Sequence, residues 1–214
     1  MSVFLSKVIS ILFHPIFMPL FTLFLIFNAD GIINHYFAGR SPYTGEDQRS
    51  RVYLVFFITT VLMPAVSFYI LKRNKLVSSF AMPHKNERFF PYLTTVVYYA
   101  ILYYLLQSNN FPLVFKTATL GTIAVVLCVM LINFRFKISS HAAGIGGVVG
   151  IYAVLIKHSW ILNGVGTLAL LVVLAGLVST ARLSLNAHRA VEVYSGLLLG
   201  FLLEFVFMHY KITI

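Results

Sequence analysis

The stretch PLVFKTATLGTIAVVLCVMLINF, residues 112–134, contains one charged side chain, Lys116, in 23 residues. A helix needs about 20 apolar residues to cross the hydrocarbon core of a bilayer. Other apolar runs lie on either side of this one, at residues 3–29, 51–71, 90–107, 142–158, 163–181 and 191–210. Because backbone inside a bilayer must satisfy its hydrogen bonds internally, each run is predicted to be a transmembrane helix.

The composition agrees with this prediction. Hydrophobic residues make up 59% of the 214 residues and charged residues only 10%, which excludes an ordinary water-soluble domain. We expect an all-α polytopic membrane bundle of six or seven helices, forming one domain over residues 1–214. The alternative of six arises because the run at 142–158 is short enough to re-enter the membrane without crossing it. The N-terminal run is interpreted as the first helix, since no small-residue cleavage site follows it.

Cysteine, proline and glycine add local predictions. The single cysteine, Cys128, excludes a disulfide framework and a thiol metal cluster. Prolines inside the first two runs are expected to bend them, because proline removes a backbone donor and crowds the preceding turn; they are Pro15, Pro19 and Pro64. Four glycines between 144 and 150 favour close helix packing over a phosphate-cradling loop.

Polar residues gather after every second apolar run. The three clusters lie at residues 72–91, 135–141 and 181–192. Even-numbered helices end on the same side of the membrane, so with seven helices these clusters converge on one face. Cations at helix ends attract phosphate, but they also mark the cytoplasmic side of many membrane proteins, and both interpretations stay open. The histidines in all three clusters favour nucleophilic and acid–base chemistry.

The third cluster has the most specific spacing. Arg182 is followed six positions later by His188, and Glu192 comes four positions after that. Residues at i and i+4 share a helix face, so Glu192 can hold one imidazole nitrogen of His188 and leave the other free to attack. Arg182 can bind phosphoryl oxygens. The alternative is a group of charged helix ends that extend to the membrane interface.

This spacing resembles the third motif of the type 2 phosphatidic acid phosphatases, Ser-Arg-x5-His-x3-Asp. Ala181 stands at the serine position and Glu192 at the aspartate position. The second family motif, Pro-Ser-Gly-His, aligns with Ile138-Ser139-Ser140-His141, which keeps the serine and the histidine. The order of the motifs, with two apolar runs between the second and third, is also that of the family. The chain therefore resembles a divergent member.

The first family motif, Lys-x6-Arg-Pro, has two alignments here. One uses Lys85 and Arg88, which keeps both cations but changes their spacing. The other starts at Lys75 and keeps the spacing and Pro83, but it places Met82 where the family has arginine. Because methionine cannot bind an oxyanion, we prefer the first alignment.

The resemblance implies a lipid phosphatase that works through a phosphohistidine. His188 would be the nucleophile, Glu192 would orient it, and His141 would act as general acid and then activate water. The expected phosphate-binding residues are Lys85, Arg88, Ser139, Ser140 and Arg182. No metal or other cofactor is implied, because the sequence offers no cluster of carboxylates for magnesium.

The expected substrate is a lipid phosphate or a polyprenyl diphosphate, and the sequence does not choose among such lipids. We expect a multi-pass protein of the bacterial cytoplasmic (inner) membrane, with membrane lipids and no nucleic acid as partners. The number of basic residues favours a cytoplasmic site, whereas the family usually acts on the outer face. A lipid-binding protein of this fold without activity, or a small multi-pass transporter, is the competing interpretation.

Two ionisable residues inside the apolar runs stay outside the predicted site. His14, before Pro15, is interpreted as a packing histidine, with a proton relay as the less favoured alternative. Glu204 comes 12 residues after Glu192, which puts it about 18 Å further along the last helix. An acid at that depth is a functional candidate by default, and pairing with a hydroxyl or basic neighbour explains it equally well.

Overall fold

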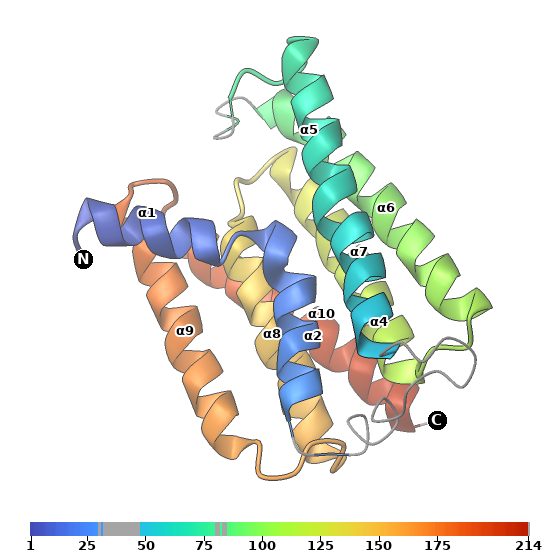
Figure 1. The fold of residues 1–214 in the computed structure, drawn as a ribbon. Coiled ribbons are helices and arrows are strands. Elements are labelled where there is room, and N and C mark those ends of the chain that lie inside the picture. Colours follow the sequence, from blue (N-terminus) through green and yellow to red (C-terminus); the bar gives the residue numbers. More distant parts are fainter. Residues whose placement is uncertain (30, 32–47, 80–81, 83–84, 214) are drawn as a thin grey trace.

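The computed structural model describes residues 1–29, 31, 48–79, 82 and 85–213. This part of the chain forms a helical bundle in which seven segments are long and apolar enough to cross a membrane (Figure 1). The all-α polytopic architecture is therefore confirmed, and the run at 142–158 belongs to one of the seven. The segments are Val3–Asn28, Gln48–Arg73, Phe89–Ser108, Leu113–Asn133, Ser140–Lys157, Val165–Ser184 and Ala190–Lys211.

The last five segments are unbroken α-helices, and the first two are interrupted. The unbroken helices are α6 (Phe89–Ser108), α7 (Leu113–Asn133), α8 (Ser140–Lys157), α9 (Val165–Ser184) and α10 (Ala190–Thr213). The first segment consists of α1 (Val3–Leu12), the 3-10 turn η1 (Pro15–Phe17) and α2 (Met18–Asn28). The second consists of α4 (Gln48–Phe57), the π-helical turn η2 (Ile58–Leu62) and α5 (Met63–Arg73), and the 3-10 turn η3 (Lys85–Arg88) precedes α6.

The interruptions lie at the prolines, as the sequence predicts. Pro15 begins η1, and α1 consequently runs across the bundle, over the end of α9, whereas α2 runs along it (Figure 1). Pro64 follows η2 at the start of α5. Pro19 falls in the first turn of α2, where proline is tolerated because the first N–H groups of a helix have no intrahelical acceptor.

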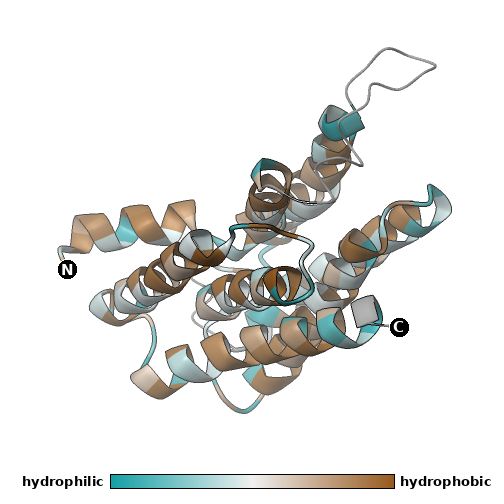
Figure 2. Ribbon diagram, turned by 90° about the horizontal axis from the view of Figure 1, so that it is seen from below, coloured by the Kyte–Doolittle hydropathy of each residue, from teal (hydrophilic) through white to brown (hydrophobic). Residues whose placement is uncertain are grey.

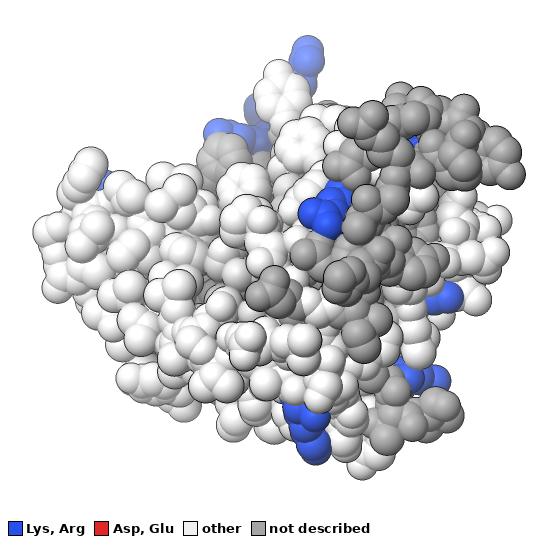
Figure 3. Space-filling view, turned by 60° about the horizontal axis from the view of Figure 1, so that its bottom comes forward, with Lys and Arg blue, Asp and Glu red and all other residues white. Residues whose placement is uncertain are grey.

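The helices are apolar along most of their length (Figure 2), and many of their exposed side chains are apolar, as lipid contact requires. Large hydrophobic side chains such as Phe4, Leu54 and Val173 are more than half exposed. On the face drawn in Figure 3, lysine and arginine form separate patches on a surface that is otherwise largely uncharged. A surface of this kind is stable in a bilayer and would aggregate in water.

The two helices at the centre, α8 and α10, pack at the distance that glycine allows. A Cβ at Gly146 would lie 2.2 Å from the carbonyl oxygen of Leu197, and a Cβ at Gly200 would lie 1.9 Å from that of Ala143. On each helix, glycines spaced four residues apart therefore face the backbone of the other helix, as in membrane helix pairs with small residues at the contact. The predicted packing role of the α8 glycines is confirmed.

This contact fixes where the candidate catalytic residues lie. At the end of the helix pair where α8 and α10 begin, the backbone N–H of Ser139 donates to the carbonyl of Glu192 at 3.0 Å. Gly196 continues the close approach, since a Cβ there would lie 2.6 Å from the carbonyl oxygen of Ser139. The start of α8, with His141, is thereby held against the start of α10, with Glu192.

Candidate active site

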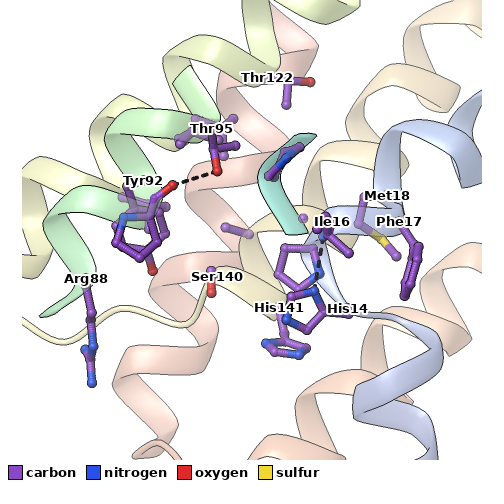
Figure 4. Close-up of a pocket in the computed structure, with 18 of the residues that line it drawn as sticks. His14, Ile16, Phe17, Met18, Arg88, Tyr92, Thr95, Thr122, Ser140 and His141 are labelled. Atoms are coloured by element: carbon purple, nitrogen blue, oxygen red, sulfur yellow. Dashed lines mark hydrogen bonds between the residues drawn. The ribbon is translucent and has the colours of Figure 1, made fainter. Parts of the chain in front are cut away.

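A cavity of 1240 Å³ lies between the helices and is lined by residues of all three polar clusters. Its walls come from the α1–α2 junction and from α5, α6, α7, α8, α9 and α10, together with the segments that precede α8 and α10. Figure 4 shows Arg88, Tyr92, Ser140, His141 and His14 around its polar end. Its ionisable lining residues include His14, Lys72, Arg73, Arg88, Lys137, His141, Arg182, His188 and Glu204.

The histidine–acid pair predicted in the third cluster is present. His188 immediately precedes α10, and Glu192 lies in its first turn. Nδ1 of His188 is 3.0 Å from Oε2 of Glu192, so Nδ1 donates its hydrogen and Nε2 keeps the lone pair. The same carboxylate oxygen accepts the backbone N–H of Arg189 at 3.1 Å, which is the glutamate half of a capping box. Glu192 thus caps α10 and orients His188.

His188 is held in its neutral form by its surroundings. Burial lowers the pKa of His188 to about 4, whereas the hydrogen bond that His188 donates to Glu192 acts to raise it. The positive charges of Lys137 and Arg182 act in the same direction as burial. A neutral imidazole with a free Nε2 is the form that can act as a nucleophile.

His141 is fixed in the opposite tautomer. It lies in the first turn of α8, and its Nε2 is 3.1 Å from the carbonyl oxygen of Ser10. A carbonyl oxygen only accepts hydrogen bonds, so Nε2 carries the hydrogen and Nδ1 is available for proton transfer. The structure therefore presents Nε2 of one histidine and Nδ1 of the other in one cavity.

Arg182 brings a positive charge to the cavity without an acid to balance it. Its Nη1 donates to the hydroxyl of Ser10 at 3.2 Å, and its buried Nε has no hydrogen-bond partner. Within the described ranges, no carboxylate forms an ion pair with this guanidinium. Arginine has five N–H donors, and among the described residues the Ser10 hydroxyl is the one acceptor hydrogen-bonded to this guanidinium.

Arg88 is a more constrained cation in the same cavity. It is 7% exposed, and its Nε and Nη2 donate to the carbonyl of Met82 at 3.0 and 2.9 Å. Its Nη1 donates to Oδ1 of Asn133 at 3.0 Å, which ties the start of α6 to the end of α7. These bonds hold the charge of Arg88 at the cavity wall. The side chain of Lys85, the other cation predicted from the first motif, lies outside the described residues.

The two serines of the second motif take different positions. Ser139 is fully buried and does not line the cavity; its hydroxyl accepts the backbone N–H of Ala142 and caps α8. In this position the Ser139 oxygen serves the helix end, and phosphate binding by Ser139 stays a prediction. Ser140 lines the cavity, in keeping with the expectation for it.

Three residues in or beside the cavity were not assigned to the site from the sequence: Ser10, His14 and Lys137. The Lys137 ammonium donates to the carbonyl of Ala187 at 2.7 Å and holds the segment before α10. His14 packs edge-to-face against His141 and also lines the cavity, so it lies beside the candidate site from which the sequence analysis left it out. A four-residue spacing in the sequence could have indicated this polar face, since Ser6, Ser10 and His14 fall on one side of a helix.

Glu204 lies deep in the bundle and is 2% exposed. The Thr122 hydroxyl lies 2.6 Å from its Oε1, which is the hydroxyl pairing considered from the sequence. Its Oε2 is buried without a hydrogen-bond partner. Gly121 makes room for this oxygen, because a Cβ there would lie 2.1 Å from it. The carboxyl group is thus packed against the backbone of α7.

The fold and the site define a class of protein: a multi-pass, all-α membrane protein with a cavity lined by histidine and arginine between its helix ends. No protein-family model matches the chain, and no curated protein or solved structure matches it either.

Proposed function

We propose that the protein is a membrane-embedded phosphohydrolase that removes phosphate from a lipid phosphate or lipid diphosphate through a phosphohistidine. The observation that carries this proposal is His188, oriented by Glu192, in one cavity with Arg182, whose charge no described carboxylate balances. Buried cations without acid partners favour an anionic ligand. The motif resemblance to the type 2 phosphatidic acid phosphatases supports the same reaction.

In the first step, Nε2 of His188 attacks phosphorus, and the bond between phosphorus and the leaving oxygen breaks. Glu192 stabilises the positive charge that the imidazole gains. His141, protonated at Nδ1 in the substrate complex, gives that proton to the leaving oxygen. Arg182 and Arg88 neutralise the charge on the phosphoryl oxygens, where it gathers in the transition state.

In the second step, water attacks the phosphorus of the phosphohistidine, and the bond between phosphorus and nitrogen breaks. The neutral His141 takes a proton from this water at Nδ1 and so returns to its starting form. Inorganic phosphate leaves, and His188 regains its lone pair. The protons balance over the two steps without a metal or other cofactor.

The position of the cavity points to an amphipathic substrate. Its polar end holds the histidines and arginines, and its remaining wall is largely apolar, with side chains such as Ile11, Phe17, Met18 and Phe68. A phosphate head group at the polar end can therefore keep its tail among apolar side chains and lipid. Phosphatidic acid, phosphatidylglycerol phosphate, polyprenyl diphosphates and lipid A phosphate all fit this description. We place the protein in the bacterial inner membrane as part of the same proposal.

The test is phosphate release by detergent-solubilised protein, in EDTA, from phosphatidic acid, phosphatidylglycerol phosphate and undecaprenyl diphosphate. We expect release by the unsubstituted protein and none by His188→Ala or His141→Ala. His158→Ala is the matched control, because His158 follows the far end of α8 and pairs with His209 away from the cavity. No release from any lipid by folded protein would favour the lipid-binding or transport interpretation instead.

A further inference from the structure

Helix α1 buries its serines against the bundle and leaves large apolar side chains exposed. Ser6 and Ser10 are buried, whereas Phe4 and Leu12 are 78% and 63% exposed. Ser10 contacts two candidate catalytic residues: its hydroxyl accepts from Arg182, and its carbonyl accepts from His141. The N-terminal helix therefore forms part of the site.

The same polar face continues into His14, at the junction of α1 and η1. Nδ1 of His14 accepts the backbone N–H of Ile16 at 3.3 Å, as an N-cap of η1 (Figure 4). A neutral imidazole that accepts at Nδ1 carries its hydrogen at Nε2. Among the described residues, none forms a hydrogen bond with this Nε2–H, and the side chain is exposed where it lines the cavity.

The ring of His14 stands edge-to-face against that of His141, with 5.1 Å between the ring centroids (Figure 4). Both histidines line the cavity together with Arg182, and Arg182 donates to Ser10, whose carbonyl oxygen accepts from His141. The ring of His14 therefore lies beside the candidate proton-transfer residue and in the same cavity as the guanidinium that would bind phosphate.

We propose that His14 is a further phosphate-binding residue of this cavity, and that it donates its Nε2–H to an oxygen of the bound phosphoryl group. This inference rests on the proposed function. The geometry favours a donor over an acid–base role, because Nδ1 is already occupied by the N–H of Ile16 and the neutral ring has no second lone pair with which to take a proton. His14 thus complements the charge of Arg182 with a neutral hydrogen bond.

The direct test is equilibrium binding of radiolabelled inorganic phosphate to the solubilised protein, which needs no turnover. His14→Phe keeps a ring that can pack against His141 but removes the donor, so it should bind phosphate about tenfold more weakly. His14→Gln places an amide nitrogen near the position of Nε2 and should bind within about threefold of the unsubstituted protein. Thermal unfolding of each variant establishes that it is folded, and His158→Ala serves as the control.

The outcomes separate the two proposals. Equal phosphate affinity in His14→Phe and in the unsubstituted protein overturns the role of His14, whether or not lipid is hydrolysed. A loss in His14→Gln as large as that in His14→Phe, with a changed pH profile of turnover, also overturns it, because it points to proton transfer. Phosphate binding that follows the expected pattern without lipid hydrolysis would leave the inference standing and count against the phosphohydrolase.

Discussion

Replacing Gly200 by alanine should force apart the helix pair that holds the site. The added Cβ would lie 1.9 Å from the carbonyl oxygen of Ala143, where real contacts do not fall below 3.0 Å. The clash is between a Cβ and a backbone oxygen, and a rotamer change moves neither atom. The helices must therefore separate by about 1 Å. Overpacking of this kind costs about 1–3 kcal/mol. The hydrogen bond from Ser139 to Glu192 lies at the same contact, so phosphate release should fall as well.

Thermal unfolding in detergent measures the effect, beside phosphate release from the preferred lipid. Gly176→Ala is the matched control, since Gly176 is also inside a helix, on α9, and a Cβ there would meet no atom within 4 Å. It should stabilise the protein by about 0.5–1 kcal/mol, because alanine loses less conformational freedom than glycine on forming a helix. If Gly200→Ala unfolds at the same temperature as the control, backbone contact between α8 and α10 does not set the geometry of the site.

Three further predictions concern individual side chains. As the pH is lowered, turnover should fall with a midpoint near pH 4, because the lowered pKa keeps His188 neutral down to about that pH. A midpoint near 6.5, the usual pKa of histidine, in a pH profile of turnover would contradict this. Glu192→Gln should keep the fold, since glutamine also completes a capping box, but lower kcat by about 10²- to 10⁴-fold because the tautomer of His188 is no longer fixed. Gly121→Ala should lower the unfolding temperature by displacing the Glu204 carboxyl from Thr122, and a second substitution, Glu204→Ala, should recover at least half of that loss.

The helices could be predicted from the sequence because lipid imposes a simple requirement on them. Apolar runs at 112–134 and 142–158 became helices at Leu113–Asn133 and Ser140–Lys157, within two residues at each end. The break at Pro15 was equally local, since it follows from a missing N–H. What the pattern did not reveal is that α1 turns across the bundle at this break, because the direction depends on packing against α9.

The site was predictable to the extent that it is local in sequence. The contact of His188 with Glu192 follows from a spacing of four residues. The partners of Arg88 do not, because Asn133 is 45 residues away and is reached only when α6 packs beside α7. The position of His14 beside the cavity does not follow from its local sequence either, because other helices complete that cavity.

The glycine contact between α8 and α10 also bears on how a protein of this kind can diverge. The two histidines stand at the starts of two helices whose separation is set by backbone touching backbone. Side chains on the outer helices can therefore change during evolution to suit the surrounding lipid. A few glycines meanwhile keep the distance between His141 and His188 constant. Homologues of this chain should be recognisable by the register of residues 139–200 even where the remaining helices share nothing but hydrophobicity.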